Sequence, residues 1–304
     1  MCDFTGCVLH VNTANYISDS PTVRIGRFIS EYFDIPFVHD LASAKDCDKK
    51  YDVVFLLPGV LLFSGHREQV ISILEKAKRV VHLENDYFLK IDGRILKAIK
   101  GRLYKWTTVP KNITNHGDLF VNWNQLTWDN IPLYKSNNQD GLFYYGAYRE
   151  GRVEYFKKYF GGDHYDIKIS SYPKNHELFK SINPNIHMYK PFGSPIQIRP
   201  FKSTIYLEDT FSHDNYTCPA NRFYECLYLG VAQWFDASCK FTFEMANIDI
   251  SPYIVNSAEE LSANLHLWDK VRRAQRVEWH RDYYDDLVSH LDESCPNKIK
   301  EMLR

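Results

Sequence analysis

The sequence lacks the features that mark several large classes of protein. No apolar run approaches the roughly 18 uncharged residues of a membrane-spanning helix, and we expect no contact with a membrane. The first ten residues lack the basic and then apolar order of a signal peptide, so we expect a cytoplasmic protein. The Gly-x-Gly-x-x-Gly, Walker and His-Glu-x-x-His motifs are missing as well.

An excess of charge and a pattern of paired cysteines are also missing. Lys and Arg total 37 against 38 Asp and Glu, a net charge of −1, so no overall field draws the protein to a polyanion. Such a partner must be met by a local patch. The seven cysteines contain no Cys-x-x-Cys pair, which argues against a zinc site or a disulfide framework and for reduced thiols.

The first half of the 304 residues alternates strand-like and helix-like segments, a pattern typical of parallel βα units. Residues 1–135 are therefore expected to form one Rossmann-like domain. The expected strands cover residues 6–12, 35–41, 51–60, 79–88, 103–109 and 118–125. The expected helices begin at Ser20, as N-cap before Pro21, and cover residues 66–79.

The second half repeats this pattern after a polar, turn-forming linker at residues 135–141. Residues 141–260 are expected to form a second Rossmann-like domain. Its expected strands cover residues 142–148, 165–171, 185–191, 203–209 and 231–236, and its expected helices cover residues 149–160 and 218–229. Helices over residues 257–304 begin with the capping box Ser257–Glu260 and are expected to cross back to the first domain.

A candidate anion site follows the first strand of the second half. Gly146 allows close backbone approach, and Arg149 and Arg152, three residues apart at a helix start, can meet a diphosphate from one side. A plain turn with solvated arginines is the alternative.

A second candidate lies in the predicted helix 218–229. Glu225 offers two carboxylate oxygens to the hydroxyls of a ribose, and Asn221 and Arg222 would face the same ligand. A solvated or ion-paired surface carboxylate is the alternative.

A candidate general base follows the strand at residues 79–88. Asp86 comes after that strand, where a carboxylate can accept a proton from an acceptor hydroxyl. A turn-forming aspartate is the alternative.

The most polarised segment runs from residue 90 to residue 111. It holds seven basic residues and one acid, Asp92, and could bind the phosphates of a duplex with Trp106 nearby to stack or wedge. A solvated face is the alternative. The candidate DNA-binding residues are Lys90, Arg94, Lys97, Lys100, Arg102 and Lys105.

With these residues in view, the chain resembles a GT-B glycosyltransferase, and within that fold the bacteriophage enzymes that glycosylate 5-hydroxymethylated pyrimidines in DNA. The resemblance rests on YYGAYREGR at residues 144–152, STIYLEDTF at 203–211 with NRFYECLYLG at 221–230, and the C-terminal helix with Trp268 and Trp279. It implies an α/β fold of two Rossmann-like domains facing a central cleft. The first domain would bind the acceptor and the second the nucleotide sugar.

The resemblance also implies roles for the candidate residues. Gly146, Arg149 and Arg152 would bind the donor diphosphate; Asn221, Arg222 and Glu225 would bind the ribose; and Asp86 would be the catalytic base. The expected reaction is sugar transfer from a UDP-sugar to the hydroxyl of a 5-hydroxymethylated pyrimidine, such as hydroxymethylcytosine, in double-stranded DNA. If the base is extruded from the duplex, an aromatic side chain such as Trp106, Trp123 or Trp128 could fill the gap, with core packing as the alternative.

The same resemblance sets the expected partners. They are a nucleotide sugar and duplex DNA with modified bases, bound by a monomer in the cytoplasm of the host if a phage encodes the chain. No metal or other cofactor is expected to be obligatory, because cationic side chains can meet the diphosphate. A GT-B enzyme for a glycan or small metabolite, and a non-catalytic nucleotide or nucleic-acid binding protein, are the alternatives.

Overall fold

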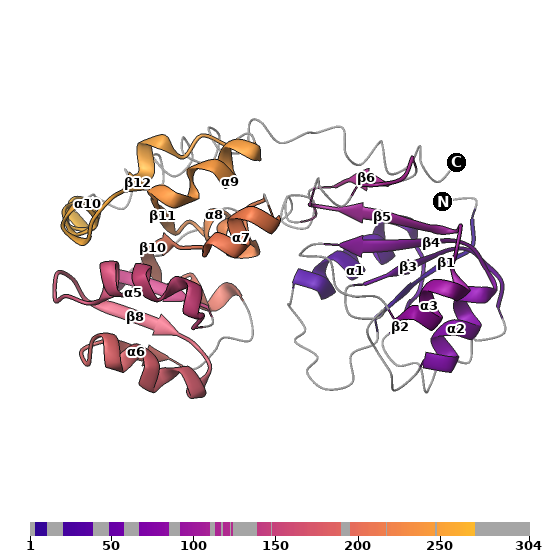
Figure 1. Ribbon diagram of the computed structural model, residues 1–304, viewed down its shortest axis with the longest axis horizontal. Helices are drawn as coiled ribbons and strands as arrows, with labels where there is room; N and C mark the ends of the chain where they lie inside the picture. The colour runs from indigo at the N-terminus through magenta and orange to yellow at the C-terminus, as the bar shows by residue number, and fades with distance from the viewer. Residues whose placement is uncertain are drawn as a thin grey trace. The chain divides into compact units, whose positions relative to one another are not determined.

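A computed structural model describes residues 4–10, 21–38, 49–57, 67–84, 92–109, 113–116, 118–121, 123, 139–146, 148–189, 195–216, 218–246 and 248–270. The chain divides into two compact units, Met1–Asp129 with Asp292–Arg304, and Asn130–Leu291 (Figure 1). The predicted roles of the two domains, and a return of the C-terminal helices to the first, stay predictions, and residues 271–304 lie outside the described residues.

The first unit contains a parallel sheet with the strand order β2-β1-β3-β4-β5-β6. Its strands are β1 (Gly6–Leu9), β2 (Phe37–Val38), β3 (Tyr51–Leu56), β4 (Ala77–Glu84), β5 (Leu103–Thr107) and β6 (Leu119–Phe120). The near-continuous apolar runs of β1 and β3 are fully covered, as strands of a parallel sheet with helices on both faces must be.

Helices cover both faces of this sheet (Figure 1). On one face, α1 (Pro21–Phe33) buries Ile25, Ile29 and Phe33 against the sheet. On the other face, α2 (Arg67–Glu75) and α3 (Gly93–Ala98) bury Val70, Ile73, Leu74 and Ile95. The helical spacing of these apolar residues is what directs one side of each helix to the core.

The tryptophans proposed for base stacking belong to the core of the first unit. Trp106 and Trp123 are 1% and 0% exposed, and Trp123 Nε1 donates to the Trp106 carbonyl at 3.1 Å. Trp106 therefore cannot stack on or wedge into DNA, which corrects that expectation, and Trp123 is excluded for the same reason. Trp128 lies outside the described residues.

The second unit contains a parallel sheet with the order β12-β11-β10-β7-β8-β9. Its strands are β7 (Gln139–Tyr145), β8 (Ile167–Ser170), β9 (His187–Tyr189), β10 (Phe201–Tyr206), β11 (Ala232–Asp236) and β12 (Ile254–Val255). The order reverses between β7 and β10, and ligands of open α/β sheets bind beyond the carboxyl ends of the strands at such a point.

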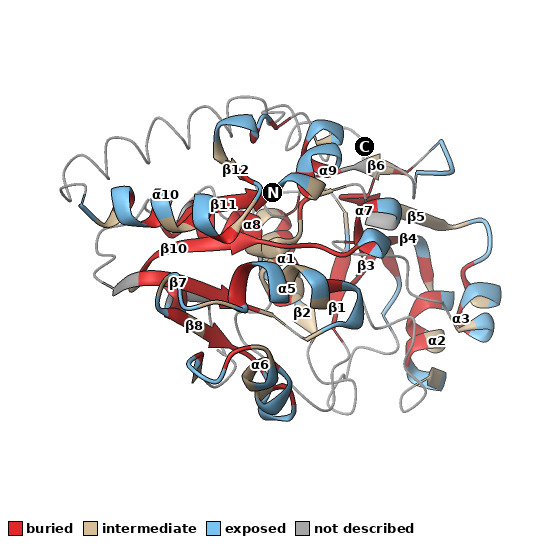
Figure 2. Cartoon of the chain, turned by 60° about the vertical axis from the view of Figure 1, so that its left-hand side comes forward, coloured by how far each residue is buried: buried red, intermediate tan, exposed pale blue. Residues whose placement is uncertain are grey.

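Helices also cover both faces of the second sheet. One face is packed by α5 (Val153–Phe160), α6 (His176–Ile182) and α10 (Ala258–Lys270). On the other, α8 (Asn221–Tyr228) and α9 (Lys240–Met245) pack through Phe223 and Phe243 on Tyr206 and Phe235, with α7 (Thr210–Tyr216) beside α9. The short 3-10 helices of this unit are η3 (Glu150–Arg152), η4 (Pro173–Asn175), η5 (Pro195–Ile198), η6 (Ala237–Cys239) and η7 (Ser251–Tyr253). Figure 2 shows the buried strands between helices whose outer sides are exposed.

Some element bounds differ from the sequence-based expectations. Helix α2 ends at Glu75 instead of Arg79, because Ala77 and Arg79 pair with β3. Strand β7 begins inside the predicted linker, at Gln139. At α10, Ser257 Oγ accepts from the Glu260 amide at 3.2 Å, as the predicted capping box requires. The reciprocal bond differs, because the Glu260 carboxylate accepts from the Asn256 amide at 2.8 Å and not from that of Ser257.

Within the described part of the chain, none of the helices has the length and apolar character needed to span a bilayer.

Candidate functional site

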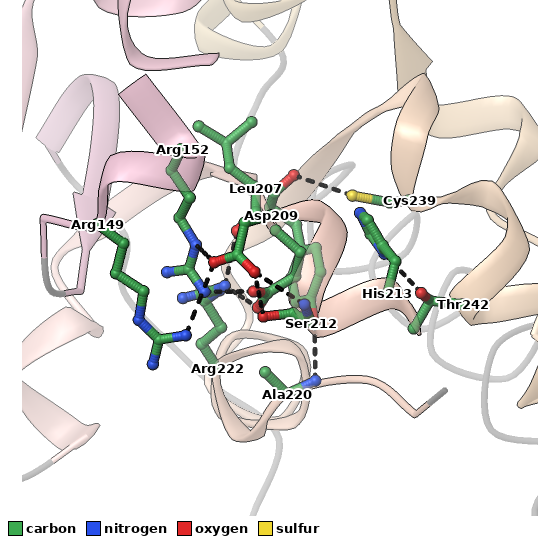
Figure 3. A network of polar contacts seen from close by, with 12 residues as sticks. Arg149, Arg152, Leu207, Asp209, Ser212, His213, Ala220, Arg222, Cys239 and Thr242 are labelled. Carbon is green, nitrogen blue, oxygen red and sulfur yellow. Dashed lines mark hydrogen bonds and ion pairs between the residues drawn. The ribbon is translucent and has the colours of Figure 1, made fainter. Parts of the chain in front are cut away.

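A cluster of arginines and buried carboxylates lies beyond the carboxyl ends of β7 and β10, at the point where the strand order of the second sheet reverses (Figure 3). Strand β10 continues into Glu208 and Asp209, each 5% exposed. Burial of two carboxylates side by side is costly unless cations compensate them. Three arginines supply that compensation.

Glu208 holds two of the arginines, one on each carboxylate oxygen. Arg152 Nη2 donates to Oε2 and Arg222 Nη2 donates to Oε1. Arg222 Nη2 also donates to the Leu207 carbonyl at 2.7 Å, and its guanidinium lies 4.9 Å from the centre of the Tyr206 ring. The side chains of Arg152 and Arg222 are 4% and 13% exposed. Both guanidiniums are therefore held in place by contacts within the protein.

Asp209 begins α7 and holds the remaining arginine. Its Oδ1 accepts from the Ser212 amide at 2.8 Å and the Ser212 hydroxyl at 2.9 Å, the geometry of a helix N-cap. Its Oδ2 lies 3.3 Å from Arg152 Nε and 3.7 Å from Arg149 Nη1. Burial alone would raise the pKa of Asp209, but the Ser212 bonds and then the two guanidiniums outweigh it and lower the pKa. Asp209 is therefore ionised at neutral pH.

Arg149 is the least constrained arginine of this cluster. Its side chain is 50% exposed, and its contact with Asp209 is long, at 3.7 Å. The cluster holds three guanidiniums and the carboxylates of Glu208 and Asp209, with the carboxylate of Glu225 nearby on α8. Because its side chain is half exposed, Arg149 can turn toward an anion without breaking a buried ion pair.

Gly146 lies beside this cluster in a backbone conformation that favours glycine. Its φ is +150°, and a Cβ there would lie 3.2 Å from Tyr144 Oη and 3.5 Å from Arg222 Nη1. The structure thus brings Gly146 and Arg222, 76 positions apart in the printed sequence, to one place. The buried hydroxyl of Tyr144 has no hydrogen-bond partner among the described residues.

Glu225 lies in the middle of α8 and is 5% exposed. Tyr145, the last residue of β7, donates its hydroxyl to Glu225 Oε2 at 2.7 Å. Burial, and then the neighbouring Cys226 and Glu225, raise the pKa of Tyr145 well above its usual value, so this hydroxyl stays protonated as a donor. Asn221 begins α8, and its buried Oδ1 has no partner within the described ranges. The structure therefore places all three predicted ribose-binding residues on one helix that starts beside the arginine cluster.

The sequence analysis missed Glu208, Asp209 and Tyr145, which orient the predicted residues. Two adjacent acids directly after a buried strand, at the carboxyl edge of a parallel sheet, are a signal that could have identified the first two.

In the first unit, β4 ends at Glu84, and the predicted base Asp86 lies outside the described residues. His82 Nδ1 lies 3.0 Å from Glu84 Oε1, with side-chain exposures of 4% and 2%. This buried pair marks the carboxyl end of β4.

The predicted DNA-binding residues fall into three groups. Lys90 lies outside the described residues. Arg94, Lys97 and Lys100 are exposed, and Lys105 Nζ donates to Thr114 Oγ1 at 3.2 Å. Arg102, in contrast, donates to the carbonyls of Leu74, Glu75, Ala77 and Ala98. Its guanidinium satisfies backbone groups where α2 and α3 end, so we leave it out of the DNA-binding surface.

The described residues contain no group of three His, Cys, Asp or Glu side chains placed to bind a metal ion. The expectation that no metal is obligatory stays a prediction.

No protein-family model and no curated protein matches the sequence. Solved structures do match. The DNA-modifying enzyme beta-glucosyltransferase is 15% identical with a TM-score of 0.68, over 98% of this chain and 99% of that one. An alpha-glucosyltransferase in complex with UDP-glucose and DNA containing an abasic site is 10% identical with a TM-score of 0.65, over 99% of both chains. AviGT4, a glycosyltransferase involved in avilamycin A biosynthesis, is 8% identical with a TM-score of 0.51, over 99% of this chain and 97% of that one.

At these identities the likeness is one of architecture, and it agrees with two parallel sheets whose strand orders are given above. The chain has the GT-B fold and resembles DNA glucosyltransferases in structure.

Proposed function

We propose that the protein is a glycosyltransferase that moves a sugar from a UDP-sugar to the hydroxyl of a 5-hydroxymethylated pyrimidine in DNA. The observation that carries the proposal is the arginine cluster beside Gly146, at the switch point of the second sheet. It offers an exposed guanidinium on Arg149, two oriented guanidiniums behind it and close backbone approach, which suit a diphosphate. The DNA acceptor is supported by two structural neighbours that are a DNA-modifying enzyme and a transferase in complex with DNA.

In this proposal the arginines share the work on the diphosphate unequally. Arg149 contacts the phosphates directly, because its guanidinium is half exposed. Arg152 keeps Glu208 and Asp209 in place and contributes charge from below the surface. Guanidiniums already oriented before the reaction stabilise the charge that develops on the departing UDP.

The uridine ribose is assigned to the start of α8. Glu225, oriented by the Tyr145 hydroxyl, accepts from the ribose hydroxyls, and Asn221 and Arg222 begin the same helix one turn earlier. A carboxylate has enough lone pairs to keep its bond to Tyr145 and accept from a ligand.

The first unit is assigned to the acceptor. Asp86 accepts the proton of the hydroxymethyl group. The hydroxymethyl oxygen then bonds to the anomeric carbon of the sugar, while the bond from that carbon to the β-phosphate oxygen breaks and UDP leaves. Arg94, Lys97, Lys100 and Lys105, together with Lys90, contribute contacts to DNA phosphates.

The test is a transfer assay with a panel of UDP-sugars and three duplexes of the same sequence, carrying 5-hydroxymethylcytosine, 5-hydroxymethyluracil or unmodified bases. We expect one sugar to be added to a hydroxymethylated nucleoside, detected by mass spectrometry after digestion. Addition to a small acceptor and to none of the duplexes would replace DNA as the acceptor. Release of no UDP with any acceptor would reject transferase activity.

A further inference from the structure

Basic side chains gather at the amino ends of β3, β4 and β5. This end of the first sheet is opposite to the carboxyl end, where β4 stops at Glu84. Two precede β3, three lie at the start of β4, and two lie at the end of α3, just before β5. We call this set the amino-edge basic surface; it comprises Lys49, Lys50, Lys76, Lys78, Arg79, Lys97 and Lys100.

Strand register places these residues next to one another. Tyr51 pairs with Ala77, so Lys50 and Lys76 precede paired positions. The Val80 amide donates to the Arg102 carbonyl at 2.9 Å, which sets the start of β5 against β4. Because neighbouring strands lie about 4.8 Å apart, the three strand starts span about 10 Å.

Arg102 fixes the position of α3 relative to this edge. Its guanidinium donates both to the Ala98 carbonyl at the end of α3 and to the Ala77 carbonyl at the start of β4. Lys97 and Lys100, on either side of Ala98, are therefore held near Lys76 and Lys78.

The surface is both exposed and strongly one-sided in charge. Lys50, Lys97 and Lys100 are exposed, and the side chain of Lys78 is 79% exposed although its Nζ lies 2.7 Å from Asp52. Among the described residues, the acids of the same strand and helix ends are Asp52 and Glu75, whereas Glu31 and Asp34 precede β2 on the far side of β1. Asp46 and Asp48, which come just before Lys49 in the sequence, lie outside the described residues. Ordinary solvated faces mix charges of both signs, and the whole chain has a net charge of −1.

We propose that the amino-edge basic surface binds the phosphates of a DNA duplex outside the segment that carries the target base. This inference rests on the proposed DNA acceptor. Six of the seven residues are lysines, which meet phosphates as mobile point charges and do not require one fixed ligand geometry. An exposed row of such charges suits an extended backbone better than a small anion, and phosphate contacts add affinity without reading sequence.

The test compares the full chain with two triple variants. One replaces Lys49, Lys50 and Lys78, exposed members of the surface that have no part in the proposed acceptor site, by Ala; the control replaces Lys157, Lys174 and Lys240, exposed lysines of the second unit, and makes the same change in net charge. Binding of an unmodified 30-bp duplex is measured by fluorescence anisotropy from 50 to 200 mM KCl. Thermal unfolding checks that all variants are folded.

Each phosphate contact contributes about 0.9 to the slope of log affinity against log salt. We expect the first variant to lose about 2 to 3 from this slope and about tenfold or more in affinity, and the control to keep both. Transfer to a hydroxymethylated 12-bp duplex should keep its kcat, whereas KM for a long duplex should rise.

An unchanged slope in an enzyme that does transfer sugar to DNA would overturn this inference alone. A lowered slope in a protein that transfers sugar to none of the duplexes would support the surface and overturn the proposed function. Heparin and double-stranded RNA of equal length are added as competitors of the labelled DNA duplex. If the first variant lost heparin binding but kept its binding of the DNA duplex, the inference would also be overturned.

Discussion

Arg149 differs from Arg152 and Arg222 in that half of its side chain is exposed. Arg149→Ala should therefore leave stability unchanged and weaken UDP binding. The loss of a charged hydrogen bond costs about 1.5–3 kcal/mol, or about 10–100-fold in affinity, measurable by calorimetric titration. Lys157→Ala, a change at a side chain that is 59% exposed, is the control and should bind UDP normally. Equal affinities of the two variants would remove Arg149 from the site.

For Glu208 we expect a loss of stability on substitution, because its carboxylate is buried between two guanidiniums. Glu208→Gln leaves two buried positive charges with less compensation, and removal of one partner of a buried pair typically costs about 3–5 kcal/mol. Urea unfolding should show this loss. The exposed Glu244→Gln, on α9, should change stability by less than about 0.5 kcal/mol. A stable Glu208→Gln protein would mean that the arginines do not depend on this carboxylate.

His213 makes stability depend on pH. It is 8% exposed, its Nδ1 lies 2.6 Å from Thr242 Oγ1, and its Nε2 has no partner among the described residues. Burial lowers the pKa of His213, against the raising effect of Glu208, Asp209 and Asp214. The unfolded chain therefore binds a proton below about pH 6.5 that the folded chain does not, and stability falls as the pH falls from there.

Unfolding free energies from pH 7 to pH 5 test this expectation. The wild-type protein should lose up to about 1.4 kcal/mol per pH unit more than His213→Asn, the slope of one proton. If the stability of the two proteins had the same dependence on pH, His213 would take up a proton equally in the folded and the unfolded chain.

Motifs in the sequence identified the arginines and Glu225 as candidate ligands, but not what holds them. The Arg149–Arg152 spacing and the Asn221–Glu225 segment are local patterns. Glu208 joins Arg152 to Arg222 across 70 positions of the sequence. That contact depends on β7 and β10 being neighbours in the sheet, which no local pattern reveals.

At the scale of elements, Arg102 links the ends of α2 and α3 through four backbone carbonyls. Arg102→Met should lower the free energy of unfolding by about 1.5–3 kcal/mol, since charged hydrogen bonds are lost, and should leave the salt slope of DNA binding nearly unchanged. Chemical unfolding and anisotropy measure the two effects. Lys100→Met is the matched control, with the reverse result expected. A stable Arg102→Met protein that binds DNA poorly would return Arg102 to the DNA surface.

Most strands of the two sheets were predicted, because a covered parallel strand such as β3 is a nearly continuous apolar run. Strand β12, of two residues, was not predicted. Helices α6, α7 and α9 were not predicted. Each has only six or seven residues, too few turns for a helical repeat of apolar residues to be recognised. The Asp209 cap shows why α7 forms nonetheless, since its carboxylate satisfies the Ser212 amide.

At the scale of the whole molecule, the proposed donor site belongs entirely to the second unit. UDP at about 100 times its Kd should stabilise that unit by about 2.7 kcal/mol. Hydrogen exchange followed by mass spectrometry should show slower exchange in β7, α5, β10 and α8, and unchanged rates in β1 to β5. Protection confined to the first unit would place the nucleotide there instead.

The confinement of the cluster to one unit also bears on how such proteins diversify. The arginines and the carboxylates that orient them lie within one stretch of the chain, from Arg149 to Arg222. Recombination upstream of that stretch would exchange the amino-terminal half while the nucleotide-handling apparatus passed on whole, and new acceptors could be acquired without rebuilding it.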